Sequence, residues 1–166
     1  MGTMIGSGVP CERSVEIAAS GAAVYDLVTA IDRVPEFSPE VRRIRWLGEL
    51  HRPEAGARFR GTNRWRGFVW RREVVITKAE PGREFCFETV PGHGIFHDTT
   101  KWRYLLEPVP SGTRVTEAYE FFAPRWLRWM DAALGRPGAL ARGMEKTLAR
   151  LKATAESGDR PASAVS

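Results

Sequence analysis

The middle of the chain alternates between apolar and polar residues. Between residues 58 and 66, Phe59, Asn63 and Trp65 share one parity, whereas arginines occupy most of the other. A period of two is typical of a β-strand with one buried face. Similar segments follow after turns that are too short for a parallel crossover, which predicts an antiparallel meander. We therefore expect strands over residues 11–18, 58–66, 68–79, 84–89, 100–107 and 115–121.

Helical patterns flank this meander. Ser20 is a suitable N-cap for a short helix over residues 22–29, and Pro35 and Pro39 restrict the next segment to a turn or a single helical turn. After the strands, residues 126–130 fit a short helix that ends before the Gly135–Gly138 segment. A long amphipathic helix is expected over residues 139–156. This order of elements predicts an α+β domain.

Composition limits the class of protein and the kinds of site that this chain can have. The 166 residues are 43% apolar and 27% charged, which fits one soluble globular domain over residues 11–157 with disordered ends at 1–10 and 158–166. Two cysteines and three histidines, without a Cys-x-x-Cys pair, predict neither a disulfide scaffold nor a metal site. The sequence contains no apolar run long enough to span a membrane and no secretory signal. We expect a cytoplasmic protein.

Positive charge is concentrated in one part of the chain. Residues 42–72 contain ten arginines against Glu49 and Glu54, a local net charge of +8 in a chain whose net charge is +5. Such a segment can bind nucleic acid or an anionic lipid surface, or it can simply coat the solvent face of a sheet. No nucleic-acid-binding motif accompanies the charge, so nucleic acid is not the expected partner.

The inward-facing positions of the meander are rich in aromatic residues. One helix cannot cover the whole inner face of so long a sheet, so these rings either interlock or form the wall of a cavity. A cavity of this kind is the usual form of a small-molecule site. The expected ligand-binding residues are Phe59, Asn63, Trp65, Trp70, Phe85, Phe87, Trp102, Tyr104, Tyr119 and Met144.

Arg72 and Glu117 are charged residues that parity directs inward, although Arg72 could also lie at the edge of the sheet. Arg72 could hold an anionic or carbonyl oxygen of a ligand through two hydrogen bonds, and Glu117 could act as a general base if burial raises its pKa. The alternative is that Arg72 and Glu117 form a buried structural ion pair, which would leave the glutamate ionised and inert.

The remaining candidates lie in or beside a loop. His93 and His97 belong to the Pro91–Asp98 segment, near the expected mouth of the cavity, and His97 is a third candidate for proton transfer. An extended backbone would direct His97 and Asp98 to opposite faces, which disfavours a direct pair. Cys86 is expected to face outward among glutamates, which raises the pKa of a thiol and makes a nucleophilic role improbable.

Five stretches of the sequence resemble the START-related SRPBCC superfamily, in particular its polyketide cyclase/dehydrase-like branch. They are Val15–Val28, Trp70 leading to Glu80-Pro81-Gly82-Arg83, Thr100–Pro108, Gly112–Glu117 and Arg142–Lys152. The resemblance covers residues 11–157 and implies the helix-grip fold, in which a curved antiparallel sheet of six to seven strands wraps around the C-terminal helix and encloses a ligand cavity.

The resemblance also implies a function. Aromatase/cyclases of this branch bind a reactive polyketide chain and need no cofactor. They carry an inward serine and arginine at the positions of Val74 and Ile76, and a tyrosine at that of Val41, so this sequence lacks their proton-transfer groups. We expect a hydrophobic, aromatic or polyketide-like ligand, bound by a monomer or homodimer. The protein would act either as a cyclase or dehydratase or as a non-catalytic carrier or sensor.

Overall fold

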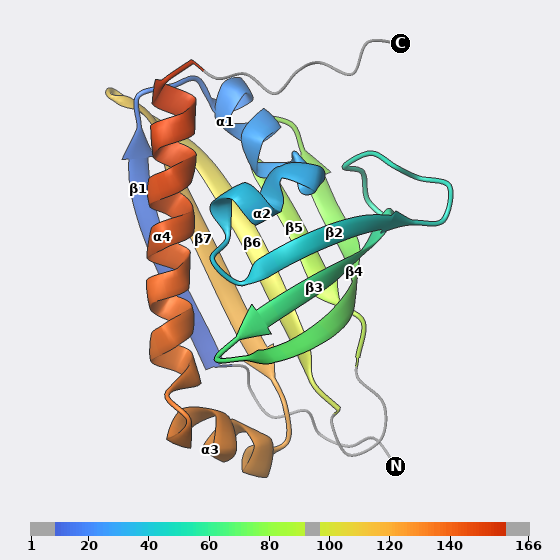
Figure 1. Cartoon of the computed structure of the whole chain (residues 1–166). Coiled ribbons are helices and arrows are strands. Elements are labelled where there is room, and N and C mark those ends of the chain that lie inside the picture. Colours follow the sequence, from blue (N-terminus) through green and yellow to red (C-terminus); the bar gives the residue numbers. More distant parts are fainter. Residues whose placement is uncertain (1–8, 92–96, 159–166) are drawn as a thin grey trace.

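The computed structural model describes residues 9–91 and 97–158 and contains one seven-stranded antiparallel sheet. The strands lie in the order β1-β7-β6-β5-β4-β3-β2, so the first and last strands of the chain are neighbours (Figure 1). The strands are β1 (Val9–Ile17), β2 (Val41–Leu47), β3 (Arg58–Trp65), β4 (Phe68–Glu80), β5 (Glu84–Thr89), β6 (Thr99–Val109) and β7 (Gly112–Phe122).

The helices follow the first and last strands. They are α1 (Gly21–Val28), the 3-10 helix η1 (Ile31–Arg33), α2 (Val34–Phe37), α3 (Arg125–Ala133) and α4 (Arg136–Glu156). The predicted N-cap is confirmed, because the hydroxyl of Ser20 accepts a hydrogen bond from the backbone N–H of Ala23. In the part of the chain that the structure describes, none of the helices is both long enough and apolar enough to cross a bilayer.

Strand β2 is the element that the alternation did not reveal. Exposed arginines occupy two adjacent positions, and the pairing with β3 shifts register between Val41 and Arg43. Such an irregularity breaks the period of two, so the alternation predicts only six strands, and the seventh was allowed only by the six to seven strands that the family resemblance implies. With β2 included, the sheet has the seven strands of the helix-grip fold.

Helix α4 begins at Arg136, three residues earlier than expected. Gly135 adopts a φ of 72°, which is readily accessible to glycine, and thereby ends the connection from α3. Pro137 lies in the first turn of the helix, where its missing N–H costs no hydrogen bond. The Gly135–Gly138 segment is therefore the start of the long helix and not an interruption before it.

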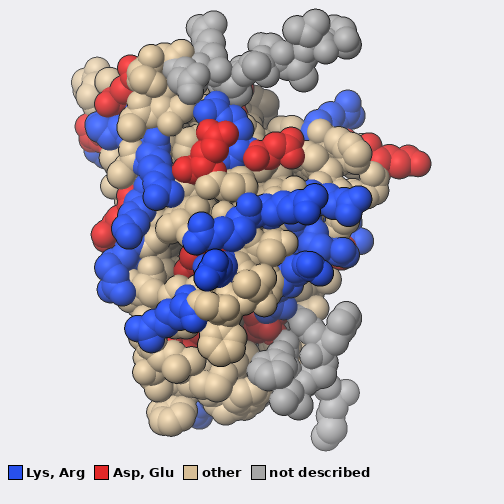
Figure 2. Space-filling view, viewed as in Figure 1, with Lys and Arg blue, Asp and Glu red and all other residues tan. Residues whose placement is uncertain are grey.

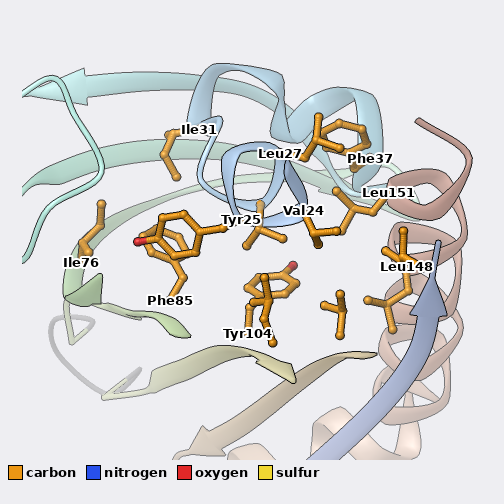
Figure 3. Packing of buried hydrophobic residues seen from close by; sticks show 14 of the residues in the cluster. Val24, Tyr25, Leu27, Ile31, Phe37, Ile76, Phe85, Tyr104, Leu148 and Leu151 are labelled. Carbon is orange, nitrogen blue, oxygen red and sulfur yellow. The ribbon is translucent and has the colours of Figure 1, made fainter. Parts of the chain in front are cut away.

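The sheet curves around α4 (Figure 1). One end of the enclosed interior is filled by apolar side chains from α1, α4 and the sheet, including Val24, Phe85, Leu148 and Leu151, all of which are buried. Figure 3 shows Tyr25 of α1 beside Phe85, and the two rings meet edge to face with centroids 6.5 Å apart. These contacts attach α1 to the sheet and close this end of the molecule.

The expected disordered ends fall almost entirely on residues that the structure does not describe. Val9 and Pro10 are exceptions because β1 already includes them, and Gly158 is a third because the structure describes it just after the C-cap of α4. Gly112 begins β7 close to this strand, and a Cβ atom there would lie 2.2 Å from the carbonyl oxygen of Ile17. Glycine is therefore required where the β6–β7 turn passes β1.

Candidate functional site

A cavity of about 1050 Å³ occupies the rest of the space between the sheet and α4. It is bounded by the inner face of the sheet, by α3 and α4, and by the segment from α1 to β2. All the residues expected to bind a ligand lie on its wall: Phe59, Asn63, Trp65, Trp70, Phe85, Phe87, Trp102, Tyr104, Tyr119 and Met144. The alternating rings thus surround a hollow space.

The rings support one another along the wall and leave the centre free. The Trp102 and Tyr119 rings have centroids 4.7 Å apart, and Phe87 stacks on the other side of Trp102 at 6.2 Å. Phe59 and Phe87 meet edge to face at 6.0 Å. Contacts of this kind hold the rings in a rigid apolar wall, which suits a ligand that is itself apolar and aromatic.

Glu117 is the polar group buried most deeply in this wall. It is only 3% exposed, and its direct cross-strand partner on β6 is Tyr104. The Tyr104 hydroxyl donates a hydrogen bond to Oε1 of Glu117 at 2.7 Å, whereas Oε2 has no hydrogen-bond partner among the described residues. Burial raises the pKa of Glu117 to about 8, although the bond from Tyr104 lowers it slightly. At neutral pH the side chain is therefore mostly a carboxylic acid with a proton to donate.

The alternative in which Arg72 pairs with Glu117 is wrong. Arg72 instead forms an ion pair with Asp98, which also lines the cavity. Parity directed both Arg72 and Glu117 inward, but β4 and β7 are separated by β5 and β6. Three strand spacings of about 4.8 Å are too far for direct contact. Arg72 is thus neutralised at one part of the wall, and Glu117 keeps its proton at another.

The structure does not bring His97 to this group. Its side chain is exposed, and it is not among the described residues that line the cavity. The neighbouring Asp98 faces the cavity instead, and His93 lies outside the described residues. Cys86 lies on the opposite parity from Phe85 and Phe87, and burial together with Glu84 raises the pKa of its thiol to about 11. This thiol is too weakly acidic to provide a nucleophile at neutral pH.

Sequence analysis missed Arg136, which joins three parts of the cavity wall. Its guanidinium pairs with both carboxylate oxygens of Glu40, and Nη2 lies 2.8 Å from Oε2. Its Cζ lies 5.0 Å from the ring centroid of Trp65 and 5.4 Å from that of Trp70. The first turn of α4 is therefore attached to the tip of the β3–β4 hairpin and to the segment before β2.

Arg136 was missed because it was assigned to the break between two helices. The sequence pattern predicts no direction for a side chain in such a break. Burial lowers the pKa of Arg136, but its bonds to Glu40 outweigh this effect and the net shift is upward. Asp131 of α3 also lines the cavity, and burial raises the pKa of its carboxyl. A basic residue just after a helix-ending glycine was the only available signal in the sequence.

Comparison with known proteins now assigns the chain to a family. A model of the family described as "Polyketide cyclase / dehydrase and lipid transport" matches residues 10–156. The chain belongs to this family. No curated protein sequence matches the chain significantly.

Solved structures agree with the family assignment. The polyketide cyclase-like protein Cgl2372 from Corynebacterium glutamicum has 31% identity and a TM-score of 0.57, over 89% of this chain and 91% of its own. The ginseng major latex-like protein 151 from Panax ginseng has 13% identity and a TM-score of 0.70, over 90% and 99% of the two chains. The second likeness shows the helix-grip fold alone.

A third structure is the di-domain aromatase/cyclase StfQ from the steffimycin biosynthetic pathway, with 16% identity and a TM-score of 0.75. The match covers 92% of this chain but only 52% of StfQ, so the chain spans about half the length of that protein. In the present chain, the positions where the resemblance implies a serine and an arginine hold Val74 and Ile76, which are both buried and apolar.

Proposed function

We propose that the cavity binds a hydrophobic, aromatic or polyketide-like molecule and that Glu117 orients it. The observation that carries this proposal is the buried Glu117 Oε2, which lies in an aromatic wall with no partner among the described residues. A neutral carboxylic acid in this position donates a hydrogen bond to a ligand oxygen, such as a ketone or a phenol. The ligand thereby supplies the hydrogen-bond partner that the described residues do not provide.

Two molecules of nearly the same shape test this proposal. Fluorenone and fluorene are both flat tricyclic aromatics, but only fluorenone has a carbonyl oxygen. Both should quench the tryptophan fluorescence of the cavity wall at pH 6, and fluorenone should bind about three- to tenfold more tightly. Glu117→Leu should abolish this preference and leave fluorene binding. Failure of both molecules to bind would contradict the cavity proposal, and equal affinities would contradict the role of Glu117.

The same acid supports a dehydratase or cyclase function. In the dehydration of a β-hydroxyketone, neutral Glu117 would protonate the departing hydroxyl as its C–O bond breaks, which releases water. The resulting carboxylate would then accept the proton from the neighbouring carbon as the C=C bond forms, which regenerates the acid. Arg72, already paired with Asp98, would polarise a carbonyl farther along the wall.

A carrier function without catalysis is the second candidate. It is favoured by Val74 and Ile76, which stand where the catalytic groups of related cyclases are expected and which are both buried and apolar. Native mass spectrometry of the freshly purified protein separates the two functions. The enzyme function is supported if the wild type dehydrates or cyclises a co-purifying molecule and Glu117→Gln leaves the same molecule unchanged. A co-purifying molecule that is released unaltered supports the carrier.

A further inference from the structure

Exposed apolar side chains gather at one end of the molecule. Six of the seven large apolar side chains that the described residues expose belong to the tip of the β3–β4 hairpin and to the α3–α4 corner. We call them the rim surface: Phe68, Val69, Trp126, Trp129, Met130 and Leu134. Phe68, Val69 and Trp129 are 76%, 62% and 74% exposed. Side chains of this size are costly to leave in water, so such a surface usually has a partner.

The two segments of the rim surface are neighbours. Figure 1 shows the hairpin tip ending beside the α3–α4 corner, and Arg136 at the start of α4 contacts Trp65 and Trp70 of the hairpin. Phe68, Met130 and Leu134 also line the cavity. The exposed apolar side chains therefore border the opening through which a ligand would reach the wall of aromatic rings.

Arginines surround this apolar surface. Arg64, Arg66, Arg71 and Arg125 are exposed, and no ion pair joins them to a carboxylate among residues 9–91 and 97–158. Arg58 and Arg60, farther from the hairpin tip, are instead paired with Glu73. Figure 2 shows the basic side chains in a band beside the largely uncharged surface at the α3 end. The combination of exposed tryptophan and phenylalanine with a basic border matches the interface of an anionic membrane.

We propose that the rim surface docks this protein on an anionic lipid bilayer. Trp126, Trp129 and Met130 lie on one exposed face of α3, and insertion of this face and of the hairpin tip would place the arginines at the level of the headgroups. A second copy of the chain fits less well, because a two-fold contact would bring identical basic borders together. The opening of the cavity would then face the bilayer, from which an apolar molecule could pass without crossing water.

This inference goes beyond the proposed function, and its test needs no cavity ligand. Vesicles of phosphatidylcholine, with or without 30% phosphatidylglycerol, are sedimented with the protein at 50 mM and 300 mM salt. Binding should require phosphatidylglycerol and should weaken at high salt. Trp129→Ser should lower the partition coefficient about tenfold or more, and Arg71→Ser about fivefold.

Matched controls come from elsewhere on the surface. Leu50→Ser removes the one large exposed apolar side chain that residues 9–91 and 97–158 place outside the rim surface, and Arg83→Ser removes an exposed arginine near the opposite end of β4. Both should bind vesicles like the wild type, and circular dichroism should show all four variants folded. The proposal is overturned if the wild type ignores anionic vesicles at low salt, or if the controls weaken binding as much as the rim variants. A dimer that Trp129→Ser dissociates in analytical ultracentrifugation, without vesicle binding, would also overturn it.

Discussion

Tyr104 and Glu117 are cross-strand partners whose side chains form a single hydrogen bond inside the cavity wall, with the hydroxyl of Tyr104 2.7 Å from Oε1 of Glu117. A tyrosine can donate only one hydrogen bond, so the second carboxyl oxygen is left for a ligand. The position of Tyr104 thus determines which oxygen of Glu117 is available.

Replacement of Glu117 by glutamine should change how stability depends on pH. The pKa of Glu117 rises from its ordinary value of 4.5 to about 8 on folding. Between these values the folded protein keeps a proton that the unfolded chain has released, so the free energy of unfolding falls with rising pH by up to about 1.4 kcal/mol per unit. Glu117→Gln has no carboxyl at this position, so its free energy of unfolding does not fall with rising pH for this reason. Urea unfolding should show the variant close to the wild type at pH 5 and a few kcal/mol more stable relative to it at pH 8.

The control for this measurement is Glu120→Gln, an exposed position on the same strand. It should leave the pH dependence of the wild type unchanged. If the free energy of unfolding changed with pH in the same way for the wild type and for Glu117→Gln, the carboxyl of Glu117 would already be ionised in the folded protein at neutral pH.

Ligand preference should follow the same protonation. Below pH 8, neutral Glu117 donates to the ketone of fluorenone, whereas above pH 8 the carboxylate repels that oxygen. The preference for fluorenone over fluorene should therefore be present at pH 6 and disappear by pH 9.5. Glu117→Gln, whose amide can donate at both pH values, should retain the preference throughout. Fluorescence titrations at the two pH values check this, and a preference that grows with pH would contradict it.

Tyr104→Phe should have two separate effects. The buried Glu117 loses its only hydrogen bond from a described side chain, so the variant should be less stable by about 1–3 kcal/mol. The pKa of Glu117 should rise further, because the bond from Tyr104 lowers it in the wild type. Carboxyl ¹³C NMR titration measures this directly. A downward shift of the pKa would show that water or another donor replaces the tyrosine.

Fold and site differ in how far the sequence could predict them. Alternation correctly placed Phe59, Trp102 and Tyr119 on the inner face, because a strand fixes the side of the sheet on which each residue lies. The predicted meander made the strands over residues 100–107 and 115–121 neighbours, but parity does not give the register between them. It could not show that Glu117 lies directly opposite Tyr104.

Irregular backbone was the other limit. The register shift in β2 concealed a strand, and the helix start at Gly135 concealed the direction of Arg136. Both are local departures from a period of two or 3.6, and both place residues on the cavity wall. Glu40 and Arg136 lie 96 positions apart, so no local pattern could have indicated their ion pair.

Arg136→Met tests whether this pair supports the cavity wall. The side chains of Arg136 and Glu40 are both mostly buried, so removal of the guanidinium leaves an unpaired carboxylate and removes a cation from the rings of Trp65 and Trp70. The expected loss is about 3–5 kcal/mol of unfolding free energy. Arg114→Met breaks the exposed pair with Glu16 and should cost less than about 1 kcal/mol. Thermal or urea unfolding distinguishes them, and equal losses would show that Arg136 contributes no more than a surface pair.

The most direct test of the hollow interior fills it from within. Gly61 lies on the cavity wall, and a Cβ atom there would meet only Nδ2 of Asn63, at 3.8 Å, so a larger side chain can enter the cavity without a backbone clash. Gly61→Phe should remain folded and should weaken binding of the neutral fluorescent probe N-phenyl-1-naphthylamine at least tenfold. Thr62→Phe, whose side chain points to the opposite face of the same strand, should bind the probe like the wild type. Unchanged probe binding by folded Gly61→Phe would contradict the account.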